Sequence, residues 1–226
     1  MPRMTNLPAR AVGILLMLAS TALAAGTYHD SLEEGDRSLT SRQADAALQA
    51  YDAAVGQSKS DGERALALGK KGYVLAYLKK DYPQAREAVD AALEVKDLAP
   101  VARVTILQVL AHCQMQADKD YEAAAKNLEE ALSLEGVEWA KPALMLALGD
   151  CRRESGKMDD ALATYASLLA MEAADSNLKA VAHLCSGFIY QYDRHDAAKA
   201  RDCYANAVKL RPELKPEVDG HLGRLP

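Results

Sequence analysis

Residues 145–171 read MLALGDCRRESGKMDDALATYASLLAM, and this stretch decides the fold. Apolar residues recur at helical spacing on both sides of Gly156, which predicts two helices joined by a short turn. Gly149 and Ala161 are small residues where two antiparallel helices would cross, and the larger Tyr165 fills the space beside them. A helix pair of this kind cannot bury its own apolar face, so it has to be stacked on copies of itself.

The rest of the chain contains these copies. A small residue in each second helix recurs at intervals of 38, 39, 37 and 39 positions, and a large or apolar residue follows it four positions later on the same face. Each first helix also has a small residue. In three repeats it lies one position further from the second helix, which we interpret as a longer turn. The second-helix residues are Ala47, Ala85, Ala124, Ala161 and Ala200, and the first-helix residues are Gly35, Gly72, Ala111, Gly149 and Gly187.

This pattern resembles the tetratricopeptide repeat (TPR) family over about residues 27–212. The segment 207–212 is similar to the closing alanine and proline of the family, and only the fifth repeat has that proline, Pro212. The first-helix tryptophan of the family is missing, since Trp139 lies in the linker before the fourth repeat. The alternative is an irregular helical bundle whose spacing is coincidental.

The resemblance implies an all-α, right-handed superhelical solenoid of about five antiparallel helix hairpins over residues 25–212. We expect a C-terminal cap over residues 213–226, because the exposed end of a solenoid needs a polar cover. The repeats are expected at about residues 27–57, 62–96, 101–135, 142–172 and 177–212.

Residues 1–24 have the features of a secretory signal peptide. Arg3 and Arg10 flank a polar opening, residues 11–18 are an apolar core, and small residues precede a cleavage site after Ala24. We therefore expect a periplasmic or secreted protein. The alternative is an uncleaved anchor helix, although the apolar run is shorter than the ~20 residues that cross a bilayer.

The charge of the chain bears on its partners. The formal net charge is −5, and removal of residues 1–24 takes away two arginines and no acid. An acidic protein of this kind is a poor partner for nucleic acid or for anionic membrane surfaces. No Asn-x-Ser/Thr acceptor for glycosylation occurs, which favours a bacterial cell envelope.

Four cysteines raise the question of disulfides in an exported chain. Cys113 and Cys151 occupy the same place in successive first helices, whose expected separation exceeds the ~7 Å limit for a disulfide. Free, buried thiols are expected there. Cys185 and Cys203 lie at about the same height on the two helices of one hairpin, so a disulfide between them is feasible. The alternative is that both are small core residues.

Motifs for catalysis or cofactor binding are absent from the sequence. No Gly-rich phosphate loop, serine elbow or Cys-x-x-Cys occurs. His112 adjoins Cys113, and His183 precedes Cys185 by two positions, but such neighbours point to different sides of a helix and do not form a metal site. We therefore expect neither enzyme activity nor a cofactor nor a metal.

The resemblance also implies a partner-binding groove. In the family the first helices line a concave face, and the positions one and four to five residues after the small residue face it. A mixture of aromatic and amide side chains suits a bound peptide, whereas Arg153 alone does not form a clamp for a C-terminal carboxylate. The alternative for each residue is packing between repeats. These positions are Tyr73, Tyr77, His112, Gln116, Asp150, Arg153, Phe188, Gln191 and Tyr192.

We therefore expect an exported scaffold or adaptor that binds another protein or a peptide in a pre-formed groove. The alternative function is the binding of a small ligand or a glycan strand, with Tyr73, Tyr77, Phe188 and Tyr192 as a stacking platform. Clustered exposed aromatic residues in a closed pocket would favour this alternative, and an open groove with a mixed polar lining would favour the peptide.

Overall fold

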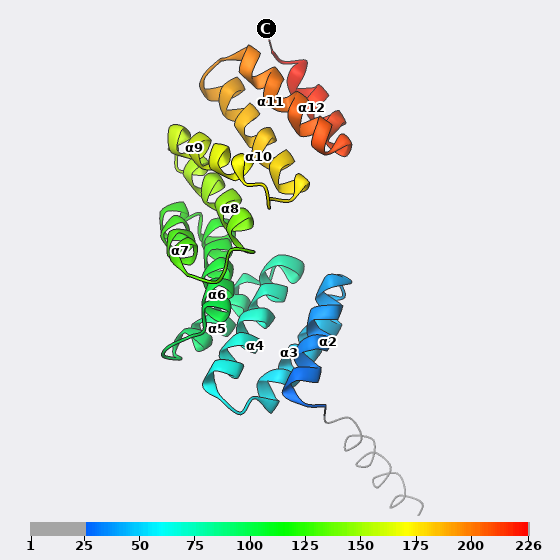
Figure 1. Ribbon diagram of the computed structural model, residues 1–226, viewed down its shortest axis with the longest axis vertical. Helices are drawn as coiled ribbons and strands as arrows, with labels where there is room; N and C mark the ends of the chain where they lie inside the picture. The colour runs from blue at the N-terminus through cyan, green and yellow to red at the C-terminus, as the bar shows by residue number, and fades with distance from the viewer. Residues whose placement is uncertain (1–25, 226) are drawn as a thin grey trace, which may run out of the picture.

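The computed structural model describes residues 26–225, and their regular structure is entirely helical (Figure 1). The predicted all-α fold class is confirmed. The signal-peptide prediction falls on residues 1–24 and lies outside the described residues. None of the helices in residues 26–225 has the length and apolar character that crossing a membrane requires.

Five helix hairpins follow one another, and a short helix closes the described chain. They are α2 (Tyr28–Thr40) with α3 (Ala44–Gln57); α4 (Asp61–Val74), continued by η1 (Leu75–Lys79), with α5 (Tyr82–Leu93); α6 (Pro100–Cys113), continued by η2 (Gln114–Asp118), with α7 (Tyr121–Ser133); α8 (Lys141–Glu154) with α9 (Met158–Ala170); α10 (Ser176–Phe188), continued by η3 (Ile189–Asp193), with α11 (Ala197–Leu210); and then η4 (Pro212–Leu214) with α12 (Lys215–Leu222).

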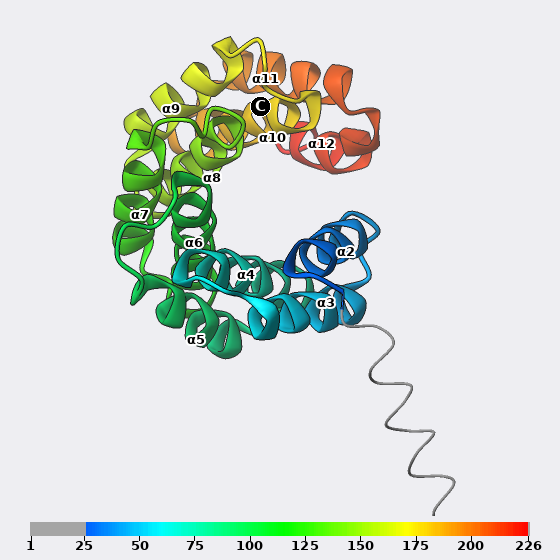
Figure 2. The same cartoon turned by 60° about the horizontal axis from the view of Figure 1, so that its bottom comes forward.

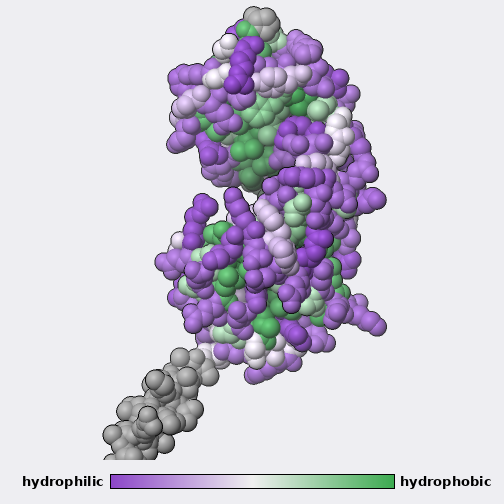
Figure 3. Space-filling view, turned by 180° about the vertical axis from the view of Figure 1, so that it is seen from behind, coloured by the Kyte–Doolittle hydropathy of each residue, from purple (hydrophilic) through white to green (hydrophobic). Residues whose placement is uncertain are grey.

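The hairpins stack into an open arc. Figure 2 shows α4, α6, α8 and α10 on its inner side and α3, α5, α7, α9 and α11 on its outer side, while α2 and α12 face each other across the opening. On the face that Figure 3 shows, most of the surface is hydrophilic, and a hydrophobic area lies beside the gap between the N-terminal and C-terminal halves of the arc. The first helices therefore form the concave wall.

Aspartates begin several second helices. The side chains of Asp81, Asp120 and Asp196 each accept a hydrogen bond from a backbone N–H three residues further on. This bond satisfies one of the free N–H groups at a helix start, which is why the acidic turns lead directly into α5, α7 and α11.

The extra residue of the second, third and fifth hairpins does not lengthen the turn, so that interpretation was wrong. It lies inside the first helix, whose last turn widens into the π-helical segments η1, η2 and η3. After each segment a backbone N–H donates to the carbonyl five residues earlier. A π-bulge absorbs one residue while the backbone remains hydrogen-bonded, which a longer exposed turn would not achieve. The three bonds run from Lys80 to Leu75, Lys119 to Gln114 and Arg194 to Ile189.

Close helix crossings hold each hairpin together. A Cβ atom added to Gly149 would come 2.3 Å from Cε1 of Tyr165, so the tyrosine ring lies directly over the glycine. Gly35 under Tyr51 and Gly187 under Tyr204 repeat the arrangement at 2.3 and 2.5 Å. The small residues of the second helices are fully buried in all five hairpins, at Ala47, Ala85, Ala124, Ala161 and Ala200.

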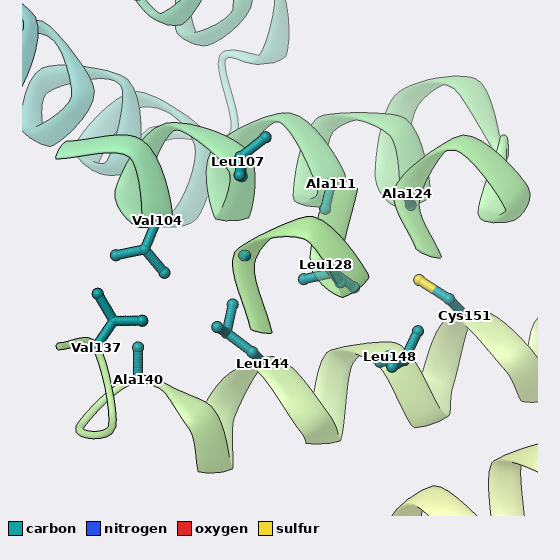
Figure 4. Close-up of a cluster of buried hydrophobic side chains, with 11 residues drawn as sticks. Val104, Leu107, Ala111, Ala124, Leu128, Val137, Ala140, Leu144, Leu148 and Cys151 are labelled. Atoms are coloured by element: carbon teal, nitrogen blue, oxygen red, sulfur yellow. The ribbon is translucent and has the colours of Figure 1, made fainter. Parts of the chain in front are cut away.

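Successive hairpins share apolar cores. Each first helix packs into the angle between the two helices of the preceding hairpin, which buries the apolar face that one hairpin leaves open. Figure 4 shows this core between the third and fourth hairpins, where Val104, Leu107, Ala111 and Leu128 meet Leu144, Leu148 and Cys151.

Helix α12 occupies the place of the first helix of a sixth hairpin. Leu214, the last residue of η4, and Val218 of α12 are buried against the fifth hairpin, and the ring of His221 stacks on Tyr204 at 5.9 Å between centroids. Leu214, Val218 and His221 are thus spaced i, i+4 and i+7. Helix α8 packs on the third hairpin with the same spacing, through Leu144, Leu148 and Cys151. The last segment therefore covers the end of the solenoid through the same contacts that join the repeats.

All four cysteines are free, so the Cys185–Cys203 disulfide is not formed. The physical reason is the orientation of Cys185, which packs on Ala161 and Tyr165 of the fourth hairpin and not on α11. Cys113 and Cys151 are buried thiols.

Candidate functional site

Two adjoining hollows lie on the concave side, between α4, α6 and α8. The first has a volume of 290 Å³ and is lined by Lys70, Thr105 and Trp139 among others. The second has a volume of 360 Å³ and is lined by Tyr77, His112, Met115, Gln116, Leu146 and Asp150 among others. They share Tyr73, Gln108 and Ala143, so they form one continuous depression. We call it the inner groove.

A column of three stacked rings forms one wall of the inner groove. Tyr73 and Tyr77 stack at 4.3 Å between ring centroids, and Tyr77 and His112 stack at 3.9 Å, with interplanar angles of 22° and 18°. Both faces of Tyr77 are therefore covered. Burial raises the pKa of the Tyr77 hydroxyl and lowers the pKa of His112. This wall is consequently uncharged near neutral pH.

Trp139 forms the rim of the first hollow. It is the only tryptophan of the chain, it lies just before α8, and 64% of it is exposed. The repeat pattern places Trp139 in a linker, and its position at the groove was not predicted. An isolated tryptophan in an otherwise polar linker was the available signal, because exposed tryptophans are enriched at binding surfaces.

The charged groups near the inner groove have partners within the fold. Lys70 Nζ lies 2.6 Å from Asp36 Oδ1, which also accepts a 2.6 Å hydrogen bond from the Tyr51 hydroxyl. The Tyr165 hydroxyl donates a 2.6 Å hydrogen bond to Asp150 Oδ1. Burial raises the pKa of Asp150, and the Tyr165 hydrogen bond opposes that rise. The groove thus offers rings, amides and apolar groups more readily than free charge.

Comparisons with known proteins identify the architecture. No family model and no curated protein matches the chain. The crystal structure of YrrB, described as a TPR protein with an unusual peptide-binding site, matches with a TM-score of 0.58 and 21% identity, over 89% of this chain and 100% of YrrB. The chain has the TPR fold.

Two crystal structures of MamA match it as well. Their TM-scores are 0.55 and 0.58 at 19% and 18% identity, and the matches cover 84% and 80% of this chain and 94% and 96% of MamA. Likeness at this level of identity concerns the TPR fold alone. The function has to be argued from the groove itself.

The predicted groove residues of the TPR solenoid divide into two groups. Five of the nine line the inner groove: Tyr73, Tyr77, His112, Gln116 and Asp150. Arg153 lies beside them, with Nη2 2.7 Å from Glu154, while its Nε is buried with no hydrogen-bond partner in the described part of the chain.

The three predicted residues of the fifth TPR hairpin contact α12. Gln191, which is buried, accepts a 2.6 Å hydrogen bond from the Tyr204 hydroxyl and donates one of 2.9 Å to the carbonyl of His221. The Tyr192 hydroxyl lies 2.7 Å from Nδ1 of His221, and the Phe188 ring lies 4.7 Å from the His221 ring. These three residues therefore lie at the contact with α12 and outside the inner groove, although Tyr192 remains 49% exposed and lines a separate hollow with Gln191.

The aromatic platform of the glycan alternative is therefore not assembled. Tyr73 and Tyr77 belong to the stacked column, and Phe188 and Tyr192 belong to the contact with α12. Tyr192 remains 49% exposed, but the two pairs belong to different contacts of the solenoid, so the four rings do not form one platform for a sugar strand.

The chemistry of the remaining side chains favours binding over reaction. Burial raises the pKa of Cys185 and of Cys151 to about 12, which leaves both thiols protonated and unreactive at neutral pH. In residues 26–225 no group of three or more histidine, cysteine or acidic side chains is placed to hold a metal ion.

Proposed function

We propose that this protein is an exported scaffold that binds a segment of another protein in its inner groove. The observation that carries the proposal is the open groove itself, with the exposed Trp139 ring at its rim and Tyr73 in its wall. Tryptophan and tyrosine supply most of the binding energy at many interfaces, because they bury a large area at a low cost in conformational entropy.

Rigidity of the wall supports this function. Apart from those in the turn just before α8, where Trp139 lies, the residues of the groove project from helices whose crossings and inter-hairpin cores are buried. A pre-formed groove loses little conformational freedom on binding, so more of the contact energy appears as affinity. YrrB, which has a similar fold, is described as having a peptide-binding site, and this supports a peptide or protein partner here.

Export is the second part of the proposal. Residues 1–24 combine two arginines, an apolar core and small residues before Ala25, as signal peptides do. The mature protein would then act in the periplasm or outside the cell. We expect the protein recovered from the envelope or the medium to begin at Ala25 when its N-terminus is sequenced. A cytoplasmic protein that retains residues 1–24 would contradict this.

The binding function is tested by capture from the envelope fraction with three immobilised proteins. These are the natural chain, Trp139→Ala, and Val101→Ala as a control that removes an exposed apolar residue outside the groove. We expect the natural chain and the control to retain the same proteins and Trp139→Ala to lose them. Equal retention by all three, with unchanged circular dichroism, would show that the groove is not the binding site.

A further inference from the structure

Building on the proposed function, we infer that the inner groove binds an uncharged, apolar-rich peptide segment in an extended conformation, with one apolar side chain packed against Trp139. Three features of the groove carry this inference: the balance of its charges, the spacing of its amides and the position of its apolar surface.

The charged side chains that line the groove, Lys70 and Asp150, already have partners within the fold. Lys70 is held by Asp36, and Asp150 is half-buried and bound by Tyr165. The imidazole of His112 is stacked on Tyr77. A charged peptide would give up its hydration on entering the groove and gain no new ion pair, which is unfavourable. An uncharged segment avoids this cost.

Two glutamine amides in the groove suit the backbone of an extended peptide. Gln108 lines the groove from α6 and Gln116 from its π-helical continuation η2, eight positions further along the chain. At the α-helical rise of ~1.5 Å per residue, the two positions are separated by at most about 12 Å along the helix axis. An extended chain advances ~3.3 Å per residue, so about four residues span this distance. The Gln108 amide already hydrogen-bonds the Tyr77 hydroxyl, and its other polar atom, like the exposed Gln116 amide, can meet a peptide group at one end of such a segment.

The apolar surface continues beyond both amides. Trp139 lies at the Gln108 end, and Met115, Leu146 and Leu178 line the second hollow. An exposed indole ring gains most from packing against a proline, leucine or aromatic side chain, because this removes apolar area from water on both partners. The groove therefore matches a segment with apolar residues and uncharged polar residues between them.

The single tryptophan reports directly on this site. The probes are short end-capped peptides built from Leu, Pro, Phe, Gln and Ser, together with matched sets in which two polar positions carry Lys or Asp. We expect peptides of the neutral set to shift the Trp139 emission to shorter wavelength, with a Kd that is the same at low and high salt. The charged sets should bind more weakly, by about tenfold or more.

Variants show where the peptide lies. Gln116→Ala removes an exposed side chain and should weaken neutral-peptide binding severalfold without affecting the melting temperature. Leu146→Arg should abolish binding by placing a charge in the second hollow. Leu210→Ala removes an exposed residue of α11 outside the groove and should change nothing.

Several results would overturn the inference. They are tighter binding of a charged set than of its neutral parent, a steep fall of affinity with salt, an emission shift with chito-oligosaccharides but with no peptide, and no shift with any probe. If proteins are nevertheless captured in a way that depends on Trp139, the proposed binding function stands and only the partner chemistry inferred here is wrong.

Discussion

In the third hairpin Ala111 packs in one core with Leu128, whereas in the fourth Gly149 lies under the ring of Tyr165. Both residue pairs fill the space at a helix crossing, but they divide the volume differently: an alanine meets a medium-sized side chain, and a glycine meets a large one. An alanine needs a smaller partner, and a tyrosine needs a glycine below it. The tyrosine also brings a hydroxyl that must find an acceptor when buried, and Asp150, next to the glycine, provides it.

The same comparison extends along the chain. The first hairpin repeats the fourth, since Gly35 lies under Tyr51 and the hydroxyl reaches Asp36. The fifth has the glycine and the tyrosine but Phe188 in place of the aspartate, and Gln191 of the π-segment becomes the acceptor. A tyrosine at a crossing thus occurs with a glycine below it and an acceptor for its hydroxyl nearby, whereas a glycine also occurs with a smaller residue, since Gly72 lies against Val89 in the second hairpin.

The largest effect is expected from Gly149→Arg. No arginine side chain can pass between α8 and α9, because even a Cβ atom would lie 2.3 Å from the tyrosine ring. We expect a loss of several kcal/mol of unfolding free energy in urea titration. Gly62→Arg is the control, since a Cβ atom there meets nothing within 4 Å. Equal melting of the two variants would refute the crossing.

A double-mutant cycle converts the fourth crossing into the third. Gly149→Ala should cost about 1–3 kcal/mol by overpacking, and Tyr165→Leu a similar amount by leaving space and an unpaired Asp150. The two changes together should cost less than their sum, with a favourable coupling of about 1 kcal/mol or more from urea titrations. Additive losses would mean that the sizes of the two residues are not matched to each other.

The pH dependence of stability tests the burial of Asp150, the acceptor of the Tyr165 hydrogen bond. Because burial raises the pKa of Asp150, this carboxyl group favours folding most in acid, and that contribution is lost as the pH rises through its folded pKa. The unfolding free energy of the natural chain minus that of Asp150→Asn should therefore fall from acid to neutral pH. Asp30→Asn should give the opposite slope, because the Thr27 backbone hydrogen bond lowers the pKa of Asp30. A flat difference for Asp150 would exclude its burial.

The smallest effect concerns ion pairs between hairpins. At three junctions an acid near the start of the second helix pairs with a cation in the next turn: Asp45 with Lys79, Glu122 with Lys157, and Asp159 with Arg194. At the remaining junction the signs are reversed, with Arg86 paired to Asp118.

Exchanging the two residues of the Arg86–Asp118 pair tests whether it matters which of the two helices carries the positive charge. Arg86→Asp or Asp118→Arg alone should each cost up to ~1 kcal/mol, because exposed ion pairs contribute little. The double exchange should restore most of the loss in thermal melts at low salt. A double variant no more stable than the singles would show that these charges do not interact.

Much of the site could not be derived from the sequence. The nine groove residues were placed by counting from the small residue of each first helix, and five of them line the inner groove, including Tyr77 and Gln116 of the π-helical segments η1 and η2. At the fifth hairpin the counted residues lie outside this groove, because the packing of α12 on that hairpin involves contacts that no local count contains. Trp139 was missed for the related reason that a linker distant in sequence enters the same hollow, whereas Lys70 lies on α4 before Gly72 and was missed because the count ran forward from that glycine.

The sequence by itself determined the helices, their pairing and the step of about 38 positions, because helical periodicity and the small residues at crossings are local properties. Only the tertiary structure decided that the extra residue enters a π-segment, that α12 closes the fifth hairpin, and that the rings of Tyr73, Tyr77 and His112 stack into one uncharged wall. Those outcomes depend on which side chains of different helices fill the same space. They follow from packing between helices and not from the residue pattern within any one helix.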